Sequence, residues 1–461
     1  MRVLLVVLIL ADAAAFKFLS NFKAASLIPR PSAMLKRRKA AKQFGDKKLA
    51  VITGASSGVG LETTAKLLGT GEYHVFGAVR DLDKMRAAAN DLDLPWEDFT
   101  PLQVELDSFE SVHTFCKELE KAKLNKPIDR LICNAATYQP GETPVWTVDG
   151  HEQTMQVNFL SHYLLVSLLL PGMVKAADPR IIMVGGARAE EGVNVYPRAD
   201  LGALEGLKSG AAQTIPMLDG SSYSGAKAYK DSKLCLSMAV DMLHRRYHKQ
   251  TGIAFSAVYP GSVTDSALLA DKPPLDKSAA LPGFVKTLAD FELRTLKGLG
   301  IGDNLHADGL TTETSSVSTA QASERLFQVA YDIRCSKSAQ WSWKEGEAAT
   351  QAAASAEEYE DARAGWESIY ENEPSGALLN LGLSQELWKE SSLVTGASWP
   401  PANQPKSPCP TLKVVGAVTK VAPAPAPLPP SILPLPYQHA RTRTHAPAHP
   451  RAPTRIRHTC S

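Results

Sequence analysis

Residues 49–60 read LAVITGASSGVG, and this stretch decides the fold of the chain. The apolar run LAVIT predicts a β-strand, and LETTAKLLGTG (61–71), which follows the glycine-rich loop, predicts an amphipathic helix. At such a junction the backbone amides at the start of the helix can face a pyrophosphate, and glycines let the backbone approach it closely. We therefore expect a dinucleotide site formed by Gly54, Ser56, Ser57, Gly58, Val59 and Gly60.

The sequence continues as an alternation of strands and helices. YHVFGAVR (73–80) predicts a second strand and DLDKMRAAANDL (81–92) a second helix. RLICNA, RIIMVGG and FSAVYPG add three strands that are apolar on both faces, as a sheet covered by helices on both sides requires. This order predicts the α/β class, with a Rossmann-type doubly wound parallel sheet in a single domain over residues 46–396. Ligands of such sheets bind at the carboxyl ends of the strands.

The end of the second strand indicates which dinucleotide binds. An NAD enzyme usually has an acidic residue there, whereas an NADP enzyme has a cation that contacts the 2′-phosphate. Arg80 therefore predicts NADPH, with Lys84 one helical turn later as a second cation. Asp81 argues mildly against this interpretation, and a solvated surface role is the alternative for either cation.

Tyr229 and Lys233 form the candidate proton-transfer pair. They are four residues apart, so they share one face of a helix. A free phenol has a pKa of about 10, and an adjacent ammonium is expected to lower it, which would suit general acid catalysis. Such pairs also occur by chance, and the position of this one downstream of a cofactor loop is what favours catalysis.

Composition limits the partners. The 461 residues include 44% hydrophobic and 21% charged residues, which suffices for a globular core, and the formal net charge of +2 does not imply a nucleic acid partner. The six cysteines show neither a C-x-x-C motif nor Cys/His pairs at metal-ligand spacing. We expect reduced thiols and no metal site.

The two ends differ in composition from the middle. Residues 1–15 predict a cleavable signal peptide, and residues 16–45, rich in Lys, Arg, Ser and Ala without an acidic residue, predict a transit peptide. Such bipartite leaders resemble those that direct proteins into plastids; a secretory signal followed by a basic linker is the alternative. Residues 397–461 are rich in proline and basic residues and predict a disordered tail without an assigned role.

Several motifs resemble the light-dependent protochlorophyllide oxidoreductase family of short-chain dehydrogenases. They are the T-G-x-x-x-G-x-G loop, CNAATYQP (133–140), VNFLSHYLL (157–165), GAKAYKDSKLC (225–235), ASERLFQVAYD and QWSWKEG. The resemblance runs from residue 47 to residue 395 and implies light-driven reduction of the C17=C18 bond of protochlorophyllide by NADPH, in chlorophyll synthesis. It also implies peripheral contact with a plastid or thylakoid membrane. The oligomeric state cannot be read from the motifs.

The resemblance also assigns roles to individual residues. It implies that the Asn158 side-chain amide supports a proton-relay water, the alternative being a helix-capping or packing role. It implies further cofactor contacts from Asp107, Asn134, Ala135, Pro260 and Gly261. It implies pigment contacts from Tyr138, Tyr259 and Ser262.

Two departures from the family pattern weaken the assignment of the substrate. Ser262 stands where the family usually has Cys, and a serine hydroxyl is a poorer acid than a thiol. Gly185 or Gly186 stands where most relatives have a catalytic Ser or Thr. Two alternatives therefore stay open, a light-independent NADP(H) oxidoreductase acting on another apolar carbonyl or alkene, and a non-catalytic pigment-binding scaffold.

Overall fold

The computed structural model describes residues 31–185, 199–263, 316–343, 366, 368–372 and 376–401. Its main feature is an eight-stranded sheet with the order β10-β9-β6-β5-β4-β1-β2-β3. The strands are β1 (Lys48–Thr53), β2 (Tyr73–Val79), β3 (Phe99–Gln103), β4 (Arg130–Cys133), β5 (Arg180–Val184), β6 (Ala254–Val258), β9 (Ala339–Trp343) and β10 (Ile369–Glu371). The predicted doubly wound sheet is confirmed, and the difference is at one edge, where β10 pairs with β9 in the antiparallel direction.

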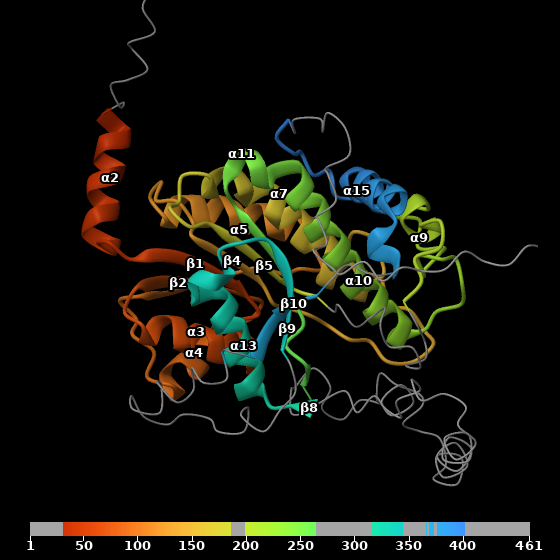
Figure 1. The fold of residues 1–461 in the computed structure, drawn as a ribbon, viewed down its shortest axis with the longest axis horizontal. Coiled ribbons are helices and arrows are strands. Elements are labelled where there is room, and N and C mark those ends of the chain that lie inside the picture. Colours follow the sequence, from red (N-terminus) through yellow and green to blue (C-terminus); the bar gives the residue numbers. More distant parts are fainter. Residues whose placement is uncertain are drawn as a thin grey trace, which may run out of the picture. The chain divides into compact units, whose positions relative to one another are not determined.

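Helices cover both faces of this sheet (Figure 1). On one face lie α3 (Gly58–Gly69), α4 (Leu82–Asp91) and α13 (Thr319–Tyr331). On the other lie α5 (Phe109–Ala122), α7 (Ser161–Met173), α10 (Gly225–Leu243) and α15 (Leu381–Thr395). Successive residues of a strand point to opposite faces of the sheet, and each face has its own hydrophobic core. Val51 packs into one core and Ile52 into the other.

Helix α2 (Pro31–Phe44) precedes the sheet in the sequence. The remaining elements are short: α6 (Gln153–Met155), α9 (Glu205–Lys208), α11 (Lys249–Thr251), the π-helical turns Gln156–Leu160 and His244–His248, the 3-10 turns Ile333–Cys335 and Gly376–Leu379, and the pair β7 (Ser262–Val263) and β8 (Ser316–Val317). None of the helices in the described ranges is long and apolar enough to cross a bilayer.

The core includes residues from both predicted end segments. Phe44, at the end of the predicted transit segment, is 1% exposed, and its ring centroid lies 4.8 Å from that of His74 and 6.2 Å from that of Phe76. Trp399, in the predicted tail, has its ring centroid 4.9 Å from that of Tyr163. The folded domain therefore extends beyond residues 46–396 at both ends. The signal peptide and most of the tail lie outside the described residues.

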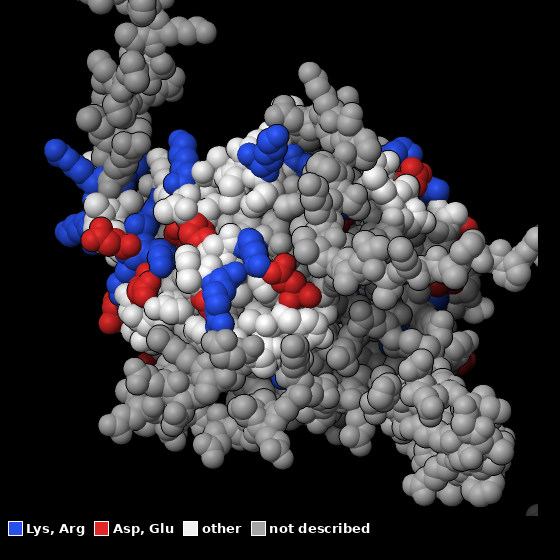
Figure 2. Space-filling view, in the orientation of Figure 1, with Lys and Arg blue, Asp and Glu red and all other residues white. Residues whose placement is uncertain are grey.

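Helix α2 has one buried side and one basic side. Ala40 and Phe44 face the core, whereas Lys36, Arg38 and Lys39 are exposed. The basic side chains of α2 form part of the blue area at the left edge of Figure 2. The buried side ties this helix to the sheet, because Phe44 contacts two residues of β2.

We expect Phe44→Ala to lower the free energy of unfolding by about 3 kcal/mol, since it removes a buried ring and leaves a cavity. Denaturant unfolding followed by circular dichroism measures the change. Leu35→Ala on the same helix is the control, because Leu35 is 57% exposed and its truncation should change stability by less than about 0.5 kcal/mol. Equal effects of the two substitutions would show that α2 does not pack on the sheet.

Candidate active site

The glycine-rich loop has the geometry of a dinucleotide cradle. Gly54 and Gly58 have φ angles of +71° and +55°, in the left-handed region that favours glycine, and Ser57 is the N-cap residue of α3. A Cβ atom at Gly60 would lie 2.3 Å from the Gly54 carbonyl oxygen and 2.5 Å from Asn134 Nδ2. The loop therefore requires glycine, and its backbone is presented at the start of a twelve-residue helix, where a pyrophosphate can be held.

Hydrogen bonds join this loop to the end of β4. The backbone N–H groups of Asn134 and Ala135 both donate to Thr53 Oγ1 at 3.0 Å, and Asn134 Nδ2 donates to the Thr53 carbonyl oxygen at 3.0 Å. The predicted cofactor residues Asn134 and Ala135 thus lie beside the glycine loop, across the junction of β1 and β4.

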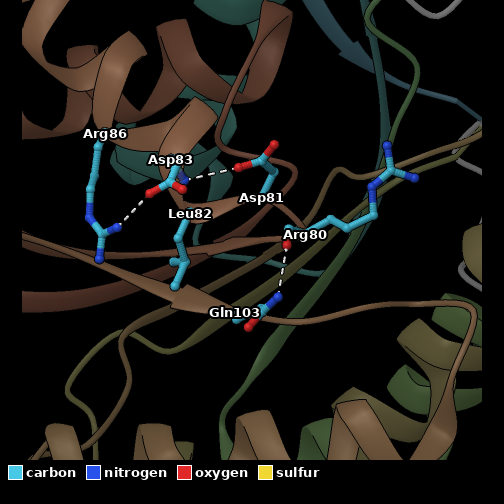
Figure 3. A pocket seen from close by; sticks show the side chains of 6 residues that line it. All are labelled: Arg80, Asp81, Leu82, Asp83, Arg86 and Gln103. Atoms are coloured by element: carbon cyan, nitrogen blue, oxygen red, sulfur yellow. Dashed lines mark hydrogen bonds and ion pairs between the residues drawn. The ribbon is translucent and has the colours of Figure 1, made fainter.

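Arg80 lies at the end of β2, exposed, beside a hollow (Figure 3). The figure shows its guanidinium turned away from Asp81 and Asp83. The Asp81 carboxylate accepts hydrogen bonds of 2.9 Å from the backbone N–H groups of Asp83 and Lys84 and so caps α4. Asp81 therefore has a helix-capping role, which accounts for an acidic residue directly after Arg80.

The hollow itself is lined by Arg80, Asp81, Leu82, Asp83, Arg86 and Gln103. Lys84, predicted as the second cation, is exposed and is not part of this lining; Arg86 is, with its guanidinium 2.7 Å from Asp83 Oδ1. Asp107 is half-buried just before α5, and its adenine contact stays a prediction.

Tyr229 and Lys233 lie on α10, and Lys233 Nζ is 5.4 Å from the centroid of the Tyr229 ring. Burial raises the pKa of Tyr229, and the nearby Tyr259 phenol raises it further. Burial lowers the pKa of Lys233 to about 8, and its ammonium donates to the Val184 carbonyl oxygen at 2.8 Å. The expectation that Lys233 lowers the pKa of Tyr229 is therefore wrong for this geometry, because desolvation dominates. The phenol stays protonated at neutral pH, as a proton donor must.

Asn158 lies in the π-helical turn Gln156–Leu160 before α7. Its Oδ1 accepts from the backbone N–H of Thr137 at 2.7 Å, and its Nδ2 donates to the Thr137 carbonyl and to Ser232 Oγ, both at 3.0 Å. Protein groups use both amide N–H donors, which leaves one Oδ1 lone pair for a water. The contacts show a side chain that fixes the loop after β4 to α10; the role of a relay water stays a prediction.

Two further tyrosines surround Tyr229. Tyr138 is 2% exposed, and its ring meets the Tyr229 ring edge-on at 5.8 Å and 68°. Tyr259 follows β6, and its backbone N–H donates to the Trp341 carbonyl at 3.1 Å. The structure thus brings two of the three predicted pigment contacts next to the proton-transfer pair, at the carboxyl ends of β4 and β6.

The segment after Tyr259 is fixed by α13. Arg325 donates to the Pro260 carbonyl at 2.8 Å, and Gly261 has a φ of +104°, where a Cβ atom would lie 2.8 Å from Val317 Cγ2. Ser262 contributes its backbone to β7, whereas its side chain and Gly186 lie outside what the structure describes.

Gly185, at the end of β5, has no side chain to offer the site. A Cβ atom there would lie 3.0 Å from Ser237 Oγ and 3.6 Å from the Lys233 carbonyl oxygen. The adjacent Ser237 hydroxyl is buried and donates weakly, at 3.4 Å, to that same carbonyl. A hydroxyl therefore lies beside Gly185, but it belongs to the core of α10.

Sequence reasoning missed a buried carboxylate beside the site. Glu152 caps α6 by accepting from the N–H groups of Thr154 and Met155, and it accepts from Tyr223 Oη at 3.0 Å. Burial raises the pKa of Glu152. Neither Glu152 nor Tyr223 belongs to a motif, and the only sequence signal is an acidic residue just before a short helix.

A second buried pair, also missed, anchors the segment that precedes α10. Lys227 Nζ lies 2.7 Å from Asp231 Oδ2 and 3.2 Å from Asp219 Oδ2, and it donates to the Asp200 carbonyl at 2.6 Å. Asp231 Oδ1 accepts from the backbone N–H of Asp200 at 2.9 Å. Asp200 and Asp219 are thus held on the same helix that carries Tyr229. Within the described ranges, no group of three or more His, Cys, Asp or Glu could hold a metal ion.

Comparisons with known proteins agree with this geometry. The family model described as short chain dehydrogenase matches residues 48–198. A protein named "Protochlorophyllide reductase, chloroplastic" from Chlamydomonas reinhardtii is 38% identical over 304 residues, which cover 64% of this chain and 70% of that protein. The protein of the same name from Daucus carota is 36% identical, with 69% and 76% covered. "Protochlorophyllide reductase A, chloroplastic" from Arabidopsis thaliana is 36% identical, with 69% and 74% covered.

Solved structures resemble the chain more distantly. The "RhlG/NADP active-site complex" of Pseudomonas aeruginosa has a TM-score of 0.36 and 21% identity, covering 49% of this chain and 77% of that chain. A short-chain dehydrogenase/reductase from Brucella melitensis has a TM-score of 0.41 and 15% identity, covering 65% and 96%.

Gly225→Ala is expected to displace the loop that carries Tyr138, because a Cβ atom there would lie 1.8 Å from the Gln139 carbonyl oxygen. We expect it to lower the free energy of unfolding by at least about 2 kcal/mol and to change the near-ultraviolet circular dichroism of the tyrosines. Gly69→Ala is the control, since no atom lies within 4 Å of its Cβ position. Indistinguishable unfolding curves for the two variants would contradict the close contact.

Proposed function

Because the chain belongs to the protochlorophyllide reductase family of short-chain dehydrogenases, we propose that it reduces the C17=C18 double bond of protochlorophyllide with NADPH, in light. The membership predicted from the motifs is confirmed by relatives of which the chain covers 70% or more. One observation carries the proposal. The Tyr229 ring contacts both the Tyr138 ring, at a centroid distance of 5.8 Å, and Lys233 Nζ, at 5.4 Å, on a helix whose first residue also bonds the loop after β4.

The residues present fit NADPH. The cradle between Gly54 and Gly60 matches a pyrophosphate, and Arg80 is an exposed cation at the position of a 2′-phosphate. When bound, NADPH supplies the hydride that adds to one carbon of the double bond. The protein holds the dinucleotide at the junction of β1 and β4, where the chain reverses its direction across the sheet.

Tyr229 supplies the proton that adds to the other carbon. The phenol O–H bond breaks, the new C–H bond forms, and the negative charge stays on the phenolate. The Lys233 ammonium, whose pKa is lowered to about 8, is still mostly protonated at neutral pH and stabilises that phenolate. Tyr138, which is 2% exposed, packs against the Tyr229 ring and would limit the access of water on that side.

Two supports of other family members are replaced here. Gly185 or Gly186 stands where most relatives have a catalytic hydroxyl, and Ser262 stands where the family usually has a more acidic thiol. The proposed proton route therefore rests on Tyr229 and Lys233 alone. Because these two supports are replaced, the flash experiment below also distinguishes a light-independent reductase and a pigment-binding scaffold.

We place the protein in the plastid, since the relatives are named chloroplastic and the leader has a bipartite composition. Contact with a plastid membrane would be peripheral and remains a prediction from the family resemblance.

The test mixes the purified chain with NADPH and protochlorophyllide in the dark and then applies a flash. We expect the protochlorophyllide absorption band to be lost only after light, and Tyr229→Phe to slow this loss by about 10²–10⁴-fold. Tyr331→Phe is the control, because its hydroxyl bonds Glu72 on the surface, away from α10. Turnover in the dark would favour the light-independent reductase, and a spectral shift without turnover would favour the scaffold. An undiminished rate in Tyr229→Phe would remove that residue as the donor.

Arg80→Ala should weaken NADPH binding by about 10–100-fold and leave NADH binding within about twofold, since only NADPH has the 2′-phosphate. Fluorescence titration with both dinucleotides measures the ratio. Arg86→Ala is a matched control, because Arg86 lines the same hollow but is paired with Asp83. A larger effect of Arg86→Ala would move the phosphate contact to that residue.

A further inference from the structure

His162 is a fully buried residue between the dinucleotide loop and the Asn158 turn, and it belongs to neither the cofactor motif nor the proton-transfer pair. Its ring contacts one group on each side. Nε2 lies 2.9 Å from Thr53 Oγ1, and Nδ1 lies 2.9 Å from the Asn158 carbonyl oxygen.

These partners determine where the ring proton is. A carbonyl oxygen can only accept, so Nδ1 must carry the hydrogen that it shares with Asn158. Thr53 Oγ1 already accepts from the N–H groups of Asn134 and Ala135, which occupy its two lone pairs. In its contact with His162 the Thr53 hydroxyl can therefore act only as the donor, and Nε2 is the acceptor.

We propose that His162 is a positioning residue, held as the neutral Nδ1–H tautomer, that sets the spacing between the nucleotide-binding end of β1 and the Asn158 turn. This role rests on the proposed function. A continuous series of hydrogen bonds runs from the end of β4 through Thr53 and His162 to Asn158. Asn158 continues it to Ser232, the neighbour of Lys233 on α10.

The surroundings exclude the charged form of the ring. A proton on Nε2 would point at the Thr53 oxygen, whose lone pairs are both occupied, and would break one of the two backbone contacts. Burial lowers the pKa of His162 to about 4, and the Lys233 ammonium lowers it as well, although the bond to the Asn158 carbonyl acts in the opposite direction. The tautomer, and with it the series of hydrogen bonds, is therefore kept across the neutral pH range.

If His162 only filled space in the core, any side chain of similar volume would serve. The following variants distinguish such a packing role from the proposed positioning role. His162→Leu fills the space without hydrogen bonds, whereas His162→Gln keeps an acceptor that can reach the Thr53 hydroxyl. His74→Leu is the control for losing a buried histidine, because His74 is 2% exposed, has a pKa lowered to about 4 by burial, and bonds Thr100 far from the site. Thermal unfolding should show comparable losses for the two leucine variants.

We expect His162→Leu to weaken NADPH binding by about 5–10-fold and to slow flash-driven turnover by about tenfold more than His74→Leu does. His162→Gln should recover part of the NADPH affinity. Thr53→Val should weaken NADPH binding at least as much as His162→Leu, because it removes the contact with His162 and also the acceptor of the Asn134 and Ala135 N–H groups. The double variant Thr53→Val/His162→Leu should therefore bind NADPH about as well as Thr53→Val alone. In ¹⁵N NMR of the histidine-labelled full chain, the His162 ring should show the neutral Nδ1–H form from pH 8 to about pH 5.

An Nε2–H tautomer, a charged ring at pH 6, or equal NADPH affinities for His162→Leu and His74→Leu would overturn the proposal. The binding and NMR measurements need no pigment turnover. If the unmodified chain did not reduce protochlorophyllide but bound NADPH and showed the expected tautomer, the proposed function would fail while the role of His162 toward the dinucleotide would stand.

Discussion

The parallel pairing of β1 with β4 is the contact on which the rest of the site depends. The chain moves outward from β1 through β2 to β3, then returns to the other side of β1 and continues through β4, β5 and β6. This reversal opens a crevice at the carboxyl ends of the two strands. Gly60, the Gly54 carbonyl and the Asn134 side chain approach one another there so closely that no side chain fits at Gly60. A larger residue at that position would separate the nucleotide loop from the strand that leads to Tyr138.

Buried polar groups connect this crevice to α10 through hydrogen bonds. Asn158 and Glu152 lie beside α10, and Asp231 lies on α10 itself. Each of the three side chains has at least two hydrogen-bond partners. Burying such a group without a hydrogen-bond partner costs free energy. Each of them therefore favours the arrangement that keeps its partners at hydrogen-bonding distance and direction. The opposite end of the sheet uses the same principle, since Arg130 and Arg180 share the Asp178 carboxylate. The sheet is therefore held by apolar packing in its middle and by polar contacts at both ends.

The local patterns of the sequence were enough to predict the sheet, the glycine loop and the pair on α10, because each depends on residues close together in the chain. The contacts that complete the site depend on residues far apart. Thr53 and His162 are separated by 109 positions, and Tyr223 and Glu152 by 71. Periodicity carries no information about such pairs. The role of Asp81 was also hidden, since an acid after a strand can bind a ribose or cap the next helix, and only the backbone geometry distinguishes the two. Trp399 escaped prediction because a single packed tryptophan does not change the composition of a proline-rich segment.

Gly185 provides no side chain at the end of β5, so the proposed proton transfer depends on Lys233. Burial makes Tyr229 a weaker acid than a free phenol, so the phenolate left after proton transfer needs a compensating charge nearby. Lys233 Nζ lies 5.4 Å from the Tyr229 ring centroid and uses one of its three N–H donors on the Val184 carbonyl at the end of β5. That bond keeps the ammonium beside the ring and leaves two donors for the dinucleotide and the phenolate. In the proposed reaction the Val184 carbonyl would not touch the reacting atoms, but it holds the Lys233 ammonium beside the Tyr229 ring.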